Sequence, residues 1–284
     1  MLSWSVGDVT ISAVVEGEHA LSCDLLFPKA TVEELAAIEW ARPDYVTPDL
    51  HVRLTIQVLL VKTPQHRIVV DTCVGNDKHR VGGMGHMLST DLLERMTAQG
   101  FGRDDVDIVL CTHLHVDHVG WNTMLEGGRW VPTFPRARYL IGRGELDYWR
   151  GQDEGDNQQI LADSIQPMFD AGLVDLVEPD HRICAEVRLI PTPGHTPGHV
   201  SVRIESVGQA ALITGDTLHN PVQLARPDWG AFVDCDPGGA EVTRRRLAEE
   251  LADSATLVIG THFSAPTAGH VVRDGEAFRL ERRS

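Results

Sequence analysis

Three histidines and one aspartate lie within the six residues from His113 to His118. Their imidazole nitrogens and carboxylate oxygens are ligands that borderline divalent metals such as Zn²⁺ prefer. In extended backbone His113 and His115 project to the same side, whereas the step from Asp117 to His118 turns the chain and offers a second pair of ligands. The run therefore predicts part of a site for two adjacent metal ions. A histidine-rich surface loop without a partner is the alternative interpretation.

Short apolar runs elsewhere in the chain also end on metal-ligand residues. Apolar runs of about four to eight residues bounded by Gly or Pro are typical of buried strands, and neighbouring strand ends can assemble one site on a rigid scaffold. We therefore expect strands at residues 67–70, 105–111, 187–190, 210–214 and 256–259. Their C-terminal ends deliver Asp71, His113, His195, Asp216 and His262.

The remaining segments predict helices and further strands. Helical spacing occurs at residues 31–40, 91–98 and 157–169, and a last helix begins with Asp236 as N-cap and Pro237 in its first turn. Further strands are expected at residues 9–15, 55–62, 138–141 and 200–204. The mixture indicates an α/β fold of two sheets packed face to face with helices outside, an αββα sandwich. A single doubly wound sheet would give a similar pattern.

The composition indicates a globular protein with an acidic surface. The 284 residues carry a formal net charge of −16, which argues against binding to nucleic acid or to anionic membranes. No apolar run is long enough to span a membrane, and the first residues do not resemble a signal peptide. We expect one domain over residues 1–284, a cytoplasmic location and a small-molecule substrate. The triplet Arg244 to Arg246 is expected on the solvated face of the last helix.

The five cysteines are scattered and form no C-x-x-C pair. This usage is typical of a reducing compartment and not of a disulfide framework. Cys111 lies two residues before His113 but ends an apolar run. We expect it to be a buried thiol and not a metal ligand.

Seven residues are candidate metal ligands: His113, His115, Asp117, His118, His195, Asp216 and His262. A catalytic zinc usually takes three protein ligands and leaves a position open for water. Seven ligands therefore suit two divalent ions, most simply Zn²⁺, with three ligands on each and one carboxylate that bridges both.

The motifs that carry these residues resemble the signature of the metallo-β-lactamase superfamily. The matching segments are V-V-D-T at 69–72, H-L-H-V-D-H at 113–118, P-G-H at 193–195, T-G-D at 214–216 and G-T-H at 260–262. The resemblance extends over residues 9–265 and implies the αββα fold. It also implies that the first metal binds His113, His115 and His195, that the second binds Asp117, His118 and His262, and that Asp216 bridges them.

Two further residues are expected to support the ligands without binding metal. Asp71 is similar to the superfamily's aspartate that orients a ligand, because a carboxylate behind a metal-bound imidazole fixes its tautomer and raises its basicity. His199 opens the strand after His195 and is expected to hold that loop by hydrogen bonding.

Within the superfamily, the chain resembles the group of N-acyl-homoserine lactonases and methyl-parathion-hydrolase-like enzymes. The segment G-D-T-L-H-N-P-V-Q at 215–223 is similar to the latter branch. Lactonases carry a Tyr three residues after the bridging Asp, where this chain has His219. The departure puts an acyl-homoserine substrate in doubt and leaves lactone or ester hydrolysis open. Related enzymes are often dimers, so a homodimer is compatible with the resemblance. The sequence itself marks no surface that would form a dimer interface.

Two metals predict hydrolysis without a Ser or Cys nucleophile. Metal binding would lower the pKa of a bound water to about 7, and the resulting hydroxide would attack a carbonyl carbon or the phosphorus of a phosphotriester. The two ions would also polarise the carbonyl oxygen and stabilise the leaving alkoxide. We expect Asp117, as a ligand, and His219 to take part in catalysis. His219 would donate a hydrogen bond to the oxyanion or a proton to the leaving group.

The sequence thus predicts a dinuclear zinc hydrolase of a lactone or related ester. The alternatives at the same site are phosphotriester or thioester hydrolysis, and then a β-lactamase or a glyoxalase II-like enzyme. The best-known class B β-lactamases, however, carry Cys in place of Asp216, and glyoxalase II has a longer helical C-terminus. From other classes, a mononuclear iron dioxygenase acting on persulfides would use only His113, His195 and Asp216, and a non-catalytic sensor would keep only the fold.

Substrate selection is expected to come from loops around the metals. The glycine-rich segment 75–88 contains Met84 and Met87, which can adapt to apolar ligands. Four aromatic residues are further candidates, with core packing as the alternative role for each: Trp121, Trp149, Trp229 and Phe232.

Overall fold

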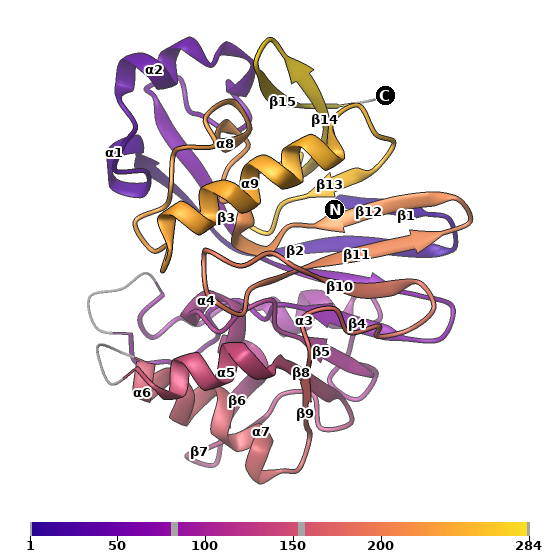
Figure 1. The fold of residues 1–284 in the computed structure, drawn as a ribbon. Helices are drawn as coiled ribbons and strands as arrows, with labels where there is room; N and C mark the ends of the chain where they lie inside the picture. The colour runs from indigo at the N-terminus through magenta and orange to yellow at the C-terminus, as the bar shows by residue number, and fades with distance from the viewer. Residues whose placement is uncertain (1, 81–84, 153–156, 283–284) are drawn as a thin grey trace. The chain divides into compact units, whose positions relative to one another are not determined.

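The computed structural model describes residues 2–80, 85–152 and 157–282 (Figure 1). The chain divides into two compact units. Unit 1 consists of residues 3–16 and 56–178, and unit 2 of residues 17–55 and those from 179 onward, together with Leu2. The expectation that residues 1–284 form one domain stays a prediction.

A seven-stranded mixed sheet, most of it in unit 1, has the strand order β1-β2-β3-β4-β5-β8-β9. Strands β3 and β4 pair antiparallel, whereas the pairs β4–β5, β5–β8 and β8–β9 are parallel. The strands are β1 (Leu2–Val6), β2 (Val9–Ser22), β3 (His51–Lys62), β4 (Arg67–Val70), β5 (Ile108–Leu110), β8 (Arg138–Gly142) and β9 (Val174–Val177). A separate hairpin pairs β6 (Thr123–Glu126) with β7 (Arg129–Pro132).

Short helices follow the strands of unit 1. They are α3 (Leu92–Thr97), α4 (Val116–Val119), the 3₁₀ helix η2 (Gly120–Asn122), α5 (Arg143–Arg150), α6 (Asn157–Ile160), the π-helix η3 (Leu161–Ile165) and α7 (Gln166–Asp170). The buried faces of these elements form one core, in which Val69 of β4 and Val109 of β5 pack in the same cluster as Leu146 of α5 and Met168 of α7. Burial of this apolar surface stabilises the unit and holds its strand ends in place.

A second mixed sheet lies in unit 2 and has the strand order β10-β11-β12-β13-β14-β15. Only the pair β12–β13 is parallel. The strands are β10 (Val187–Pro191), β11 (Val200–Ser206), β12 (Gln209–Ile213), β13 (Leu257–Ile259), β14 (Ala268–Asp274) and β15 (Ala277–Glu281). The helices are α1 (Cys23–Leu26), α2 (Val32–Ala37), η1 (Glu39–Ala41), η4 (Gly215–Thr217), α8 (Val222–Ala225) and α9 (Pro237–Leu251). Its own core contains Phe27, Trp229 and Leu247.

The α/β fold with two mixed sheets that the sequence predicts is confirmed. Every expected strand forms, although β2 runs seven residues further than the expected end at Val15, to Ser22. The expected helix over 157–169 forms as three pieces around the π-helix η3. The predicted start of α9 is confirmed, because the Asp236 side chain accepts a hydrogen bond from Gly239 N at 3.0 Å and Pro237 begins the helix.

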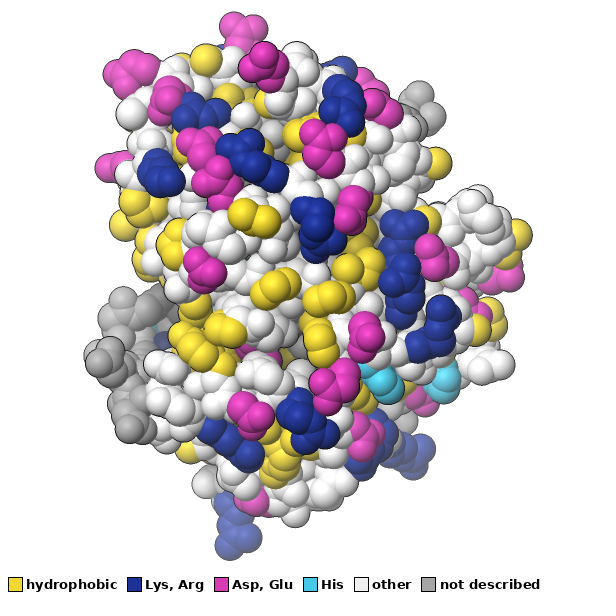
Figure 2. Space-filling view, in the orientation of Figure 1, with side chains coloured by type: hydrophobic (Ala, Val, Ile, Leu, Met, Phe, Trp, Pro, Cys, Tyr) yellow, Lys and Arg dark blue, Asp and Glu magenta, His cyan; other side chains and the backbone are white. Residues whose placement is uncertain are grey.

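The arginine triplet of α9 corrects one expectation. Arg245 and Arg246 lie at the surface and pair with glutamates four residues away on α9. Figure 2 shows acidic and basic side chains interspersed on the face that carries this helix. Arg244, however, is buried at 1% exposure. It lies three and four residues before the buried Leu247 and Ala248, so the helical period places it on the inner face of α9.

No helix in the described part of the chain combines the length and the apolar character that a membrane span requires.

Candidate metal centre

The strand pairing of unit 1 brings Asp71 beside the start of the histidine run. Val70, the last residue of β4, is the parallel partner of Leu110, the last residue of β5. Asp71 N continues this pairing and donates to Leu110 O at 2.9 Å. Asp71 has a φ of 56°, a left-handed conformation that aspartate adopts more readily than most residues. Its side chain therefore turns toward Thr112 and the residues after it.

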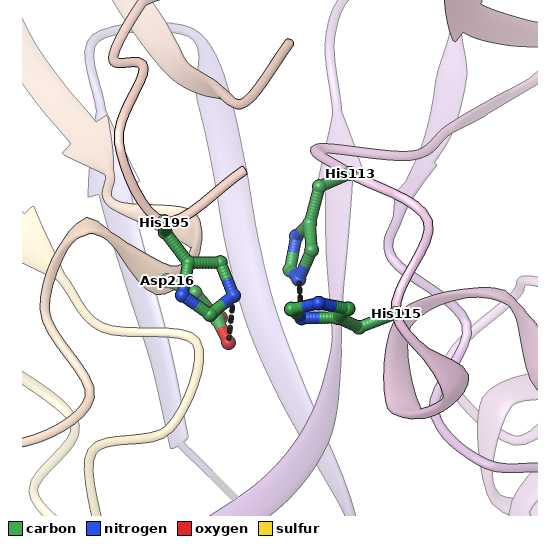
Figure 3. A group of neighbouring side chains, drawn as sticks. All are labelled: His113, His115, His195 and Asp216. Atoms are coloured by element: carbon green, nitrogen blue, oxygen red, sulfur yellow. Dashed lines mark hydrogen bonds and ion pairs between the residues drawn. The ribbon is translucent and has the colours of Figure 1, made fainter. Parts of the chain in front are cut away.

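His113 and His115 lie against one another in unit 1. His113 Nε2 is 3.0 Å from His115 Nδ1, and a dashed line joins these two residues in Figure 3. His113 is fully buried and its Nδ1 lies 3.1 Å from Thr112 Oγ1. The ring of His118, which follows in α4, has its centroid 4.0 Å from that of His113. Three imidazoles of the run therefore gather in one place.

Asp71 holds the ring of His118. Asp71 Oδ2 accepts a hydrogen bond from His118 Nδ1 at 2.9 Å, and the same carboxylate accepts from Thr112 N and Thr112 Oγ1. His118 Nε2 is thereby turned toward Asp117, whose Oδ1 lies 3.7 Å away. This is the geometry in which a carboxylate fixes the tautomer of an imidazole.

Glu145 is a buried residue of unit 1 that the sequence reasoning missed. Its Oε1 accepts hydrogen bonds from Leu114 N at 3.1 Å and from Trp149 Nε1 at 2.6 Å. Leu114 separates His113 from His115, so Glu145 fixes the backbone between them. No motif marks Glu145, because it reaches this backbone from α5 across 31 residues.

Asp216 is the point on which three imidazoles of unit 2 converge. Its Oδ2 lies 3.1 Å from His262 Nε2, 3.3 Å from His219 Nε2 and 3.5 Å from His195 Nε2. Figure 3 shows the His195–Asp216 pair. All four residues are at most 4% exposed.

The sheet of unit 2 explains this convergence. Ile213 of β12 and Ile259 of β13 are parallel partners, so the segments that carry Asp216 and His262 leave at the same edge. The β10–β11 hairpin places the loop of residues 192–199 at that edge too, because Val202 of β11 pairs with Ile213. His195 lies in this loop.

The second nitrogens of two of these rings are held by hydrogen-bond acceptors. His262 Nδ1 donates to Thr55 O at 2.9 Å, and His195 Nδ1 donates to Asp234 Oδ1 at 2.9 Å. A carbonyl or carboxylate oxygen only accepts, so each Nδ1 carries the proton. In the neutral ring, Nε2 then presents a lone pair toward the Asp216 carboxylate.

Two lone-pair acceptors about 3 Å apart in a buried site repel one another unless a positive charge lies between them. The donor set of imidazole nitrogens and a carboxylate therefore fits a divalent cation such as zinc. His118 shows the same pattern in unit 1, with Nδ1 held by Asp71 and Nε2 facing Asp117. Each unit thus contains a cluster of histidine and aspartate residues with the chemistry of a metal site.

His219 lies 4% exposed between η4 and α8. Its backbone N donates to Gln223 Oε1 at 2.7 Å, which fixes the main chain. Its ring stacks on His262 with an interplanar angle of 6°. Apart from the 3.3 Å approach to Asp216, neither ring nitrogen has a hydrogen-bond partner among the described residues. A buried imidazole without such partners is costly unless a ligand completes it.

His199 lies behind Asp216. Its Nε2 accepts a hydrogen bond from Asp216 N at 2.9 Å, and its Nδ1 donates to Thr192 O at 3.1 Å. It thereby links the backbone before His195 to the backbone of Asp216 and presents neither nitrogen to the cluster.

Asp234 was also missed by the sequence reasoning. It lies 39 residues after His195 in the loop before α9, and its side chain is fully buried against the His195 ring. The atoms of His195, His219 and Asp234 that could bind a cation lie within 4.8 Å of one another. The sequence signal that could have pointed to Asp234 is the apolar face of α9, which carries its partner Arg244.

Cys111 is buried as expected, and burial raises the pKa of its thiol to about 12. The thiolate that would bind a metal is therefore strongly disfavoured at neutral pH.

The residues expected to select the substrate have different surroundings. Trp229 packs in the core of unit 2, and Trp121 Nε1 donates to the partly buried Glu16 at 2.7 Å. Trp149 lies with its ring centroid 5.2 Å from that of His115. Phe232 and Met87 are exposed, and Met84 lies outside the described residues.

The chain is similar to known proteins of one superfamily. The sequence profile of the Metallo-beta-lactamase superfamily matches residues 52–262. An N-acyl homoserine lactonase of Bacillus thuringiensis is 24% identical over 230 residues, which cover 76% of this chain and 84% of that protein. A probable metallo-hydrolase of Mycobacterium tuberculosis is 30% identical over 184 residues, which cover 60% of this chain and 58% of that protein.

Solved structures give the same picture of the fold. AidC, a dizinc quorum-quenching lactonase in complex with a product, has a TM-score of 0.81 at 23% identity, covering 99% of this chain and 97% of its own. The hydrolase AbOPH in the β-lactamase superfamily has a TM-score of 0.79 at 25% identity, covering 100% and 97%. Because the superfamily profile spans more than half of the sequence, this chain belongs to the metallo-β-lactamase superfamily and resembles, at distant identity, the N-acyl homoserine lactonases.

Proposed function

We propose that this protein is a dinuclear metal hydrolase that opens a lactone or a related ester. The proposal is supported by the histidine and aspartate clusters of both units and by the family to which the chain belongs. It is supported as well by the relatives that are named as N-acyl homoserine lactonases.

Seven side chains are the proposed ligands. One ion would bind His113, His115 and His195, the other Asp117, His118 and His262, and Asp216 would bridge the two. The observation that carries the proposal is the convergence of three imidazole nitrogens on Asp216 Oδ2 in unit 2. Two of these rings carry their proton on the far nitrogen, so they can supply lone pairs to a cation.

When bound, two zinc ions would supply an activated water and polarise the substrate carbonyl. The residues of the chain then have distinct tasks. Asp71 holds the His118 ring and His199 holds the Asp216 backbone. His219 is the proposed donor to the reacting ester, because its buried ring nitrogens have no hydrogen-bond partner among the described residues. It would donate a hydrogen bond to the developing oxyanion or a proton to the leaving oxygen.

The substrate class is tested with zinc-loaded protein and a panel of one lactone, one aryl ester, one thioester, one phosphotriester and one β-lactam. We expect turnover of the lactone or the ester to exceed that of the other three, with the ring-opened acid or the free acid as product. A His118→Ala variant should lose this turnover. A His181→Ala variant, changed outside the clusters, should keep it.

Preferred hydrolysis of the phosphotriester, thioester or β-lactam would keep the metal chemistry but replace the proposed substrate class. Bound iron with oxygen uptake on a persulfide would contradict the proposal. So would full zinc loading without turnover of any member of the panel, which would indicate a sensor.

A further inference from the structure

A fully buried carboxylate outside the proposed ligand set contacts one of the proposed ligands. Asp234 Oδ1 accepts a hydrogen bond from His195 Nδ1 at 2.9 Å, and both side chains are 0% exposed. Asp234 Oδ2 accepts from Ala231 N at 3.0 Å and from Arg244 Nη1 at 3.2 Å. Both oxygens of this carboxylate are therefore committed to fixed donors, and the residue cannot turn away from His195 without breaking them.

Arg244 supplies the charge that a buried carboxylate needs. Its side chain is 1% exposed, and its Nε donates to Pro227 O at 3.0 Å. Removing one partner of such a pair leaves the other buried and uncompensated, which is strongly destabilising. Among the described residues, Asp234 is the acid that pairs with this buried guanidinium on the inner face of α9.

The start of α9 also fixes the backbone on which His195 stands. Cys235 N donates to His195 O at 2.8 Å, and Asp236 N donates to Gly194 O at 2.9 Å. Gly194 has a φ of 130°, and a Cβ there would lie 2.2 Å from Ala240 N, so glycine is required for this close approach. With the main chain held in this way, the remaining freedom of His195 is the rotation and tautomer of its ring.

We infer that Asp234 and Arg244 form a positioning pair for His195, an inference that rests on the proposed function. Asp234 holds the proton on Nδ1, turns Nε2 toward Asp216 and strengthens Nε2 as a metal donor. Arg244 pairs with the Asp234 carboxylate and holds it in place. The pair does for unit 2 what Asp71 does for His118 in unit 1. Neither residue contacts the substrate in this role.

The inference is tested by measuring the zinc affinity of the full chain in competition with a chromogenic chelator. We expect D234N to weaken the binding of one of two zinc ions by about 10–100-fold, the cost of removing a partner of a metal-bound histidine. R244M should weaken the same ion. R245M removes the neighbouring arginine, which pairs with Glu241 at the surface, and should leave both affinities unchanged.

A second measurement separates positioning from simple structural support. A support role would lower the melting temperature of the metal-free and zinc-loaded forms equally. A positioning role makes the rise in melting temperature on zinc addition smaller in D234N than in the wild type. If R244M does not fold, R244K keeps the charge and should retain more of the zinc affinity than D234N.

Wild-type zinc affinity in D234N, with only a lower melting temperature, would overturn the inference and leave the proposed function standing, provided that the wild type binds two ions and turns over its substrate. A wild type that binds no zinc would overturn both.

Discussion

The tautomers of the buried histidines limit what their second nitrogens can bind. His118, His195 and His262 each donate from Nδ1 to an oxygen of the protein. The three acceptors differ, since Asp71 and Asp234 are carboxylates and Thr55 offers a backbone carbonyl. A charged acceptor raises the basicity of the imidazole more than a neutral one. The three rings therefore share one tautomer but differ as donors.

His219 is not one of the proposed metal ligands, but we expect catalysis to depend on it. We expect His219→Ala to lower kcat/KM by about 100-fold, the lower range for a positioned proton or hydrogen-bond donor. The zinc content should stay at the wild-type level. Steady-state kinetics with metal analysis of the same sample measures both. An unchanged kcat/KM at full metal content would show that His219 only packs.

Lys78 gives a prediction on pH and stability. Its Nζ is buried, donates to Thr123 Oγ1 at 2.6 Å and lies 3.6 Å from the centroid of the Trp130 ring. Desolvation lowers its pKa from 10.5 to about 7. Below pH 7 both the folded and the unfolded chain carry the charge, and the folded state bears the full cost of burying it. Between about pH 7 and 10.5 only the unfolded state keeps the proton, so this group makes the free energy of unfolding rise with pH.

The measurement is the free energy of unfolding in denaturant across that pH range, compared between the wild type and Lys78→Met. We expect the difference, wild type minus variant, to increase from pH 7 to 10.5. Lys62→Met, changed at the exposed end of β3, serves as the control. A difference that stays flat would mean that Lys78 titrates normally in the folded protein.

Sequence separation decides which residues of the site could be predicted. The proposed ligands follow strands directly, so short apolar runs and the residues after them sufficed. Asp234 and Glu145 reach their partners across 39 and 31 residues and belong to no motif. The burial of Arg244 could have been predicted, because the helical period of α9 places it beside Leu247 on the buried face.

At the scale of elements, two parallel strand pairs place the proposed ligands. The pair β4–β5 ends at Asp71 and the histidine run, and the pair β12–β13 ends at Asp216 and His262. The strands were predictable from local apolar runs, but their pairing was not, since it is decided by the packing of each core. The π-helix at residues 161–165 likewise left no sequence signal, and the periodicity there predicted an unbroken helix.

The turn after the histidine run is held by a close approach of two backbone segments. A Cβ at Gly120 would lie 1.7 Å from Val74 O. Val74 O is a backbone atom, so no side-chain rotation can relieve this clash. We expect Gly120→Ala to lower the free energy of unfolding by about 3 kcal/mol or to displace the 116–122 segment. Gly144→Ala in α5, where a Cβ meets open space, should instead raise it by about 0.5–1 kcal/mol. Equal effects of the two changes in denaturant unfolding would contradict this explanation.

At the scale of the whole molecule, each unit carries its own core and its own share of the proposed ligands. Ligands that bind only the folded chain stabilise it, by roughly 4 kcal/mol at a free concentration 1,000-fold above the dissociation constant. We therefore expect removal of metal by a chelator to lower the melting temperature, and zinc to restore it. His118→Ala should reduce this effect of zinc, whereas His181→Ala should not. An identical melting temperature with and without zinc would contradict a metal centre in the folded protein.

The decisive measurement is a titration of metal-free protein with zinc while the initial rate of lactone or ester hydrolysis is followed. We predict no turnover without metal and a rate that reaches its plateau only when two zinc ions are bound per chain. A plateau at one ion, or full turnover in the metal-free protein, would contradict a dinuclear hydrolase.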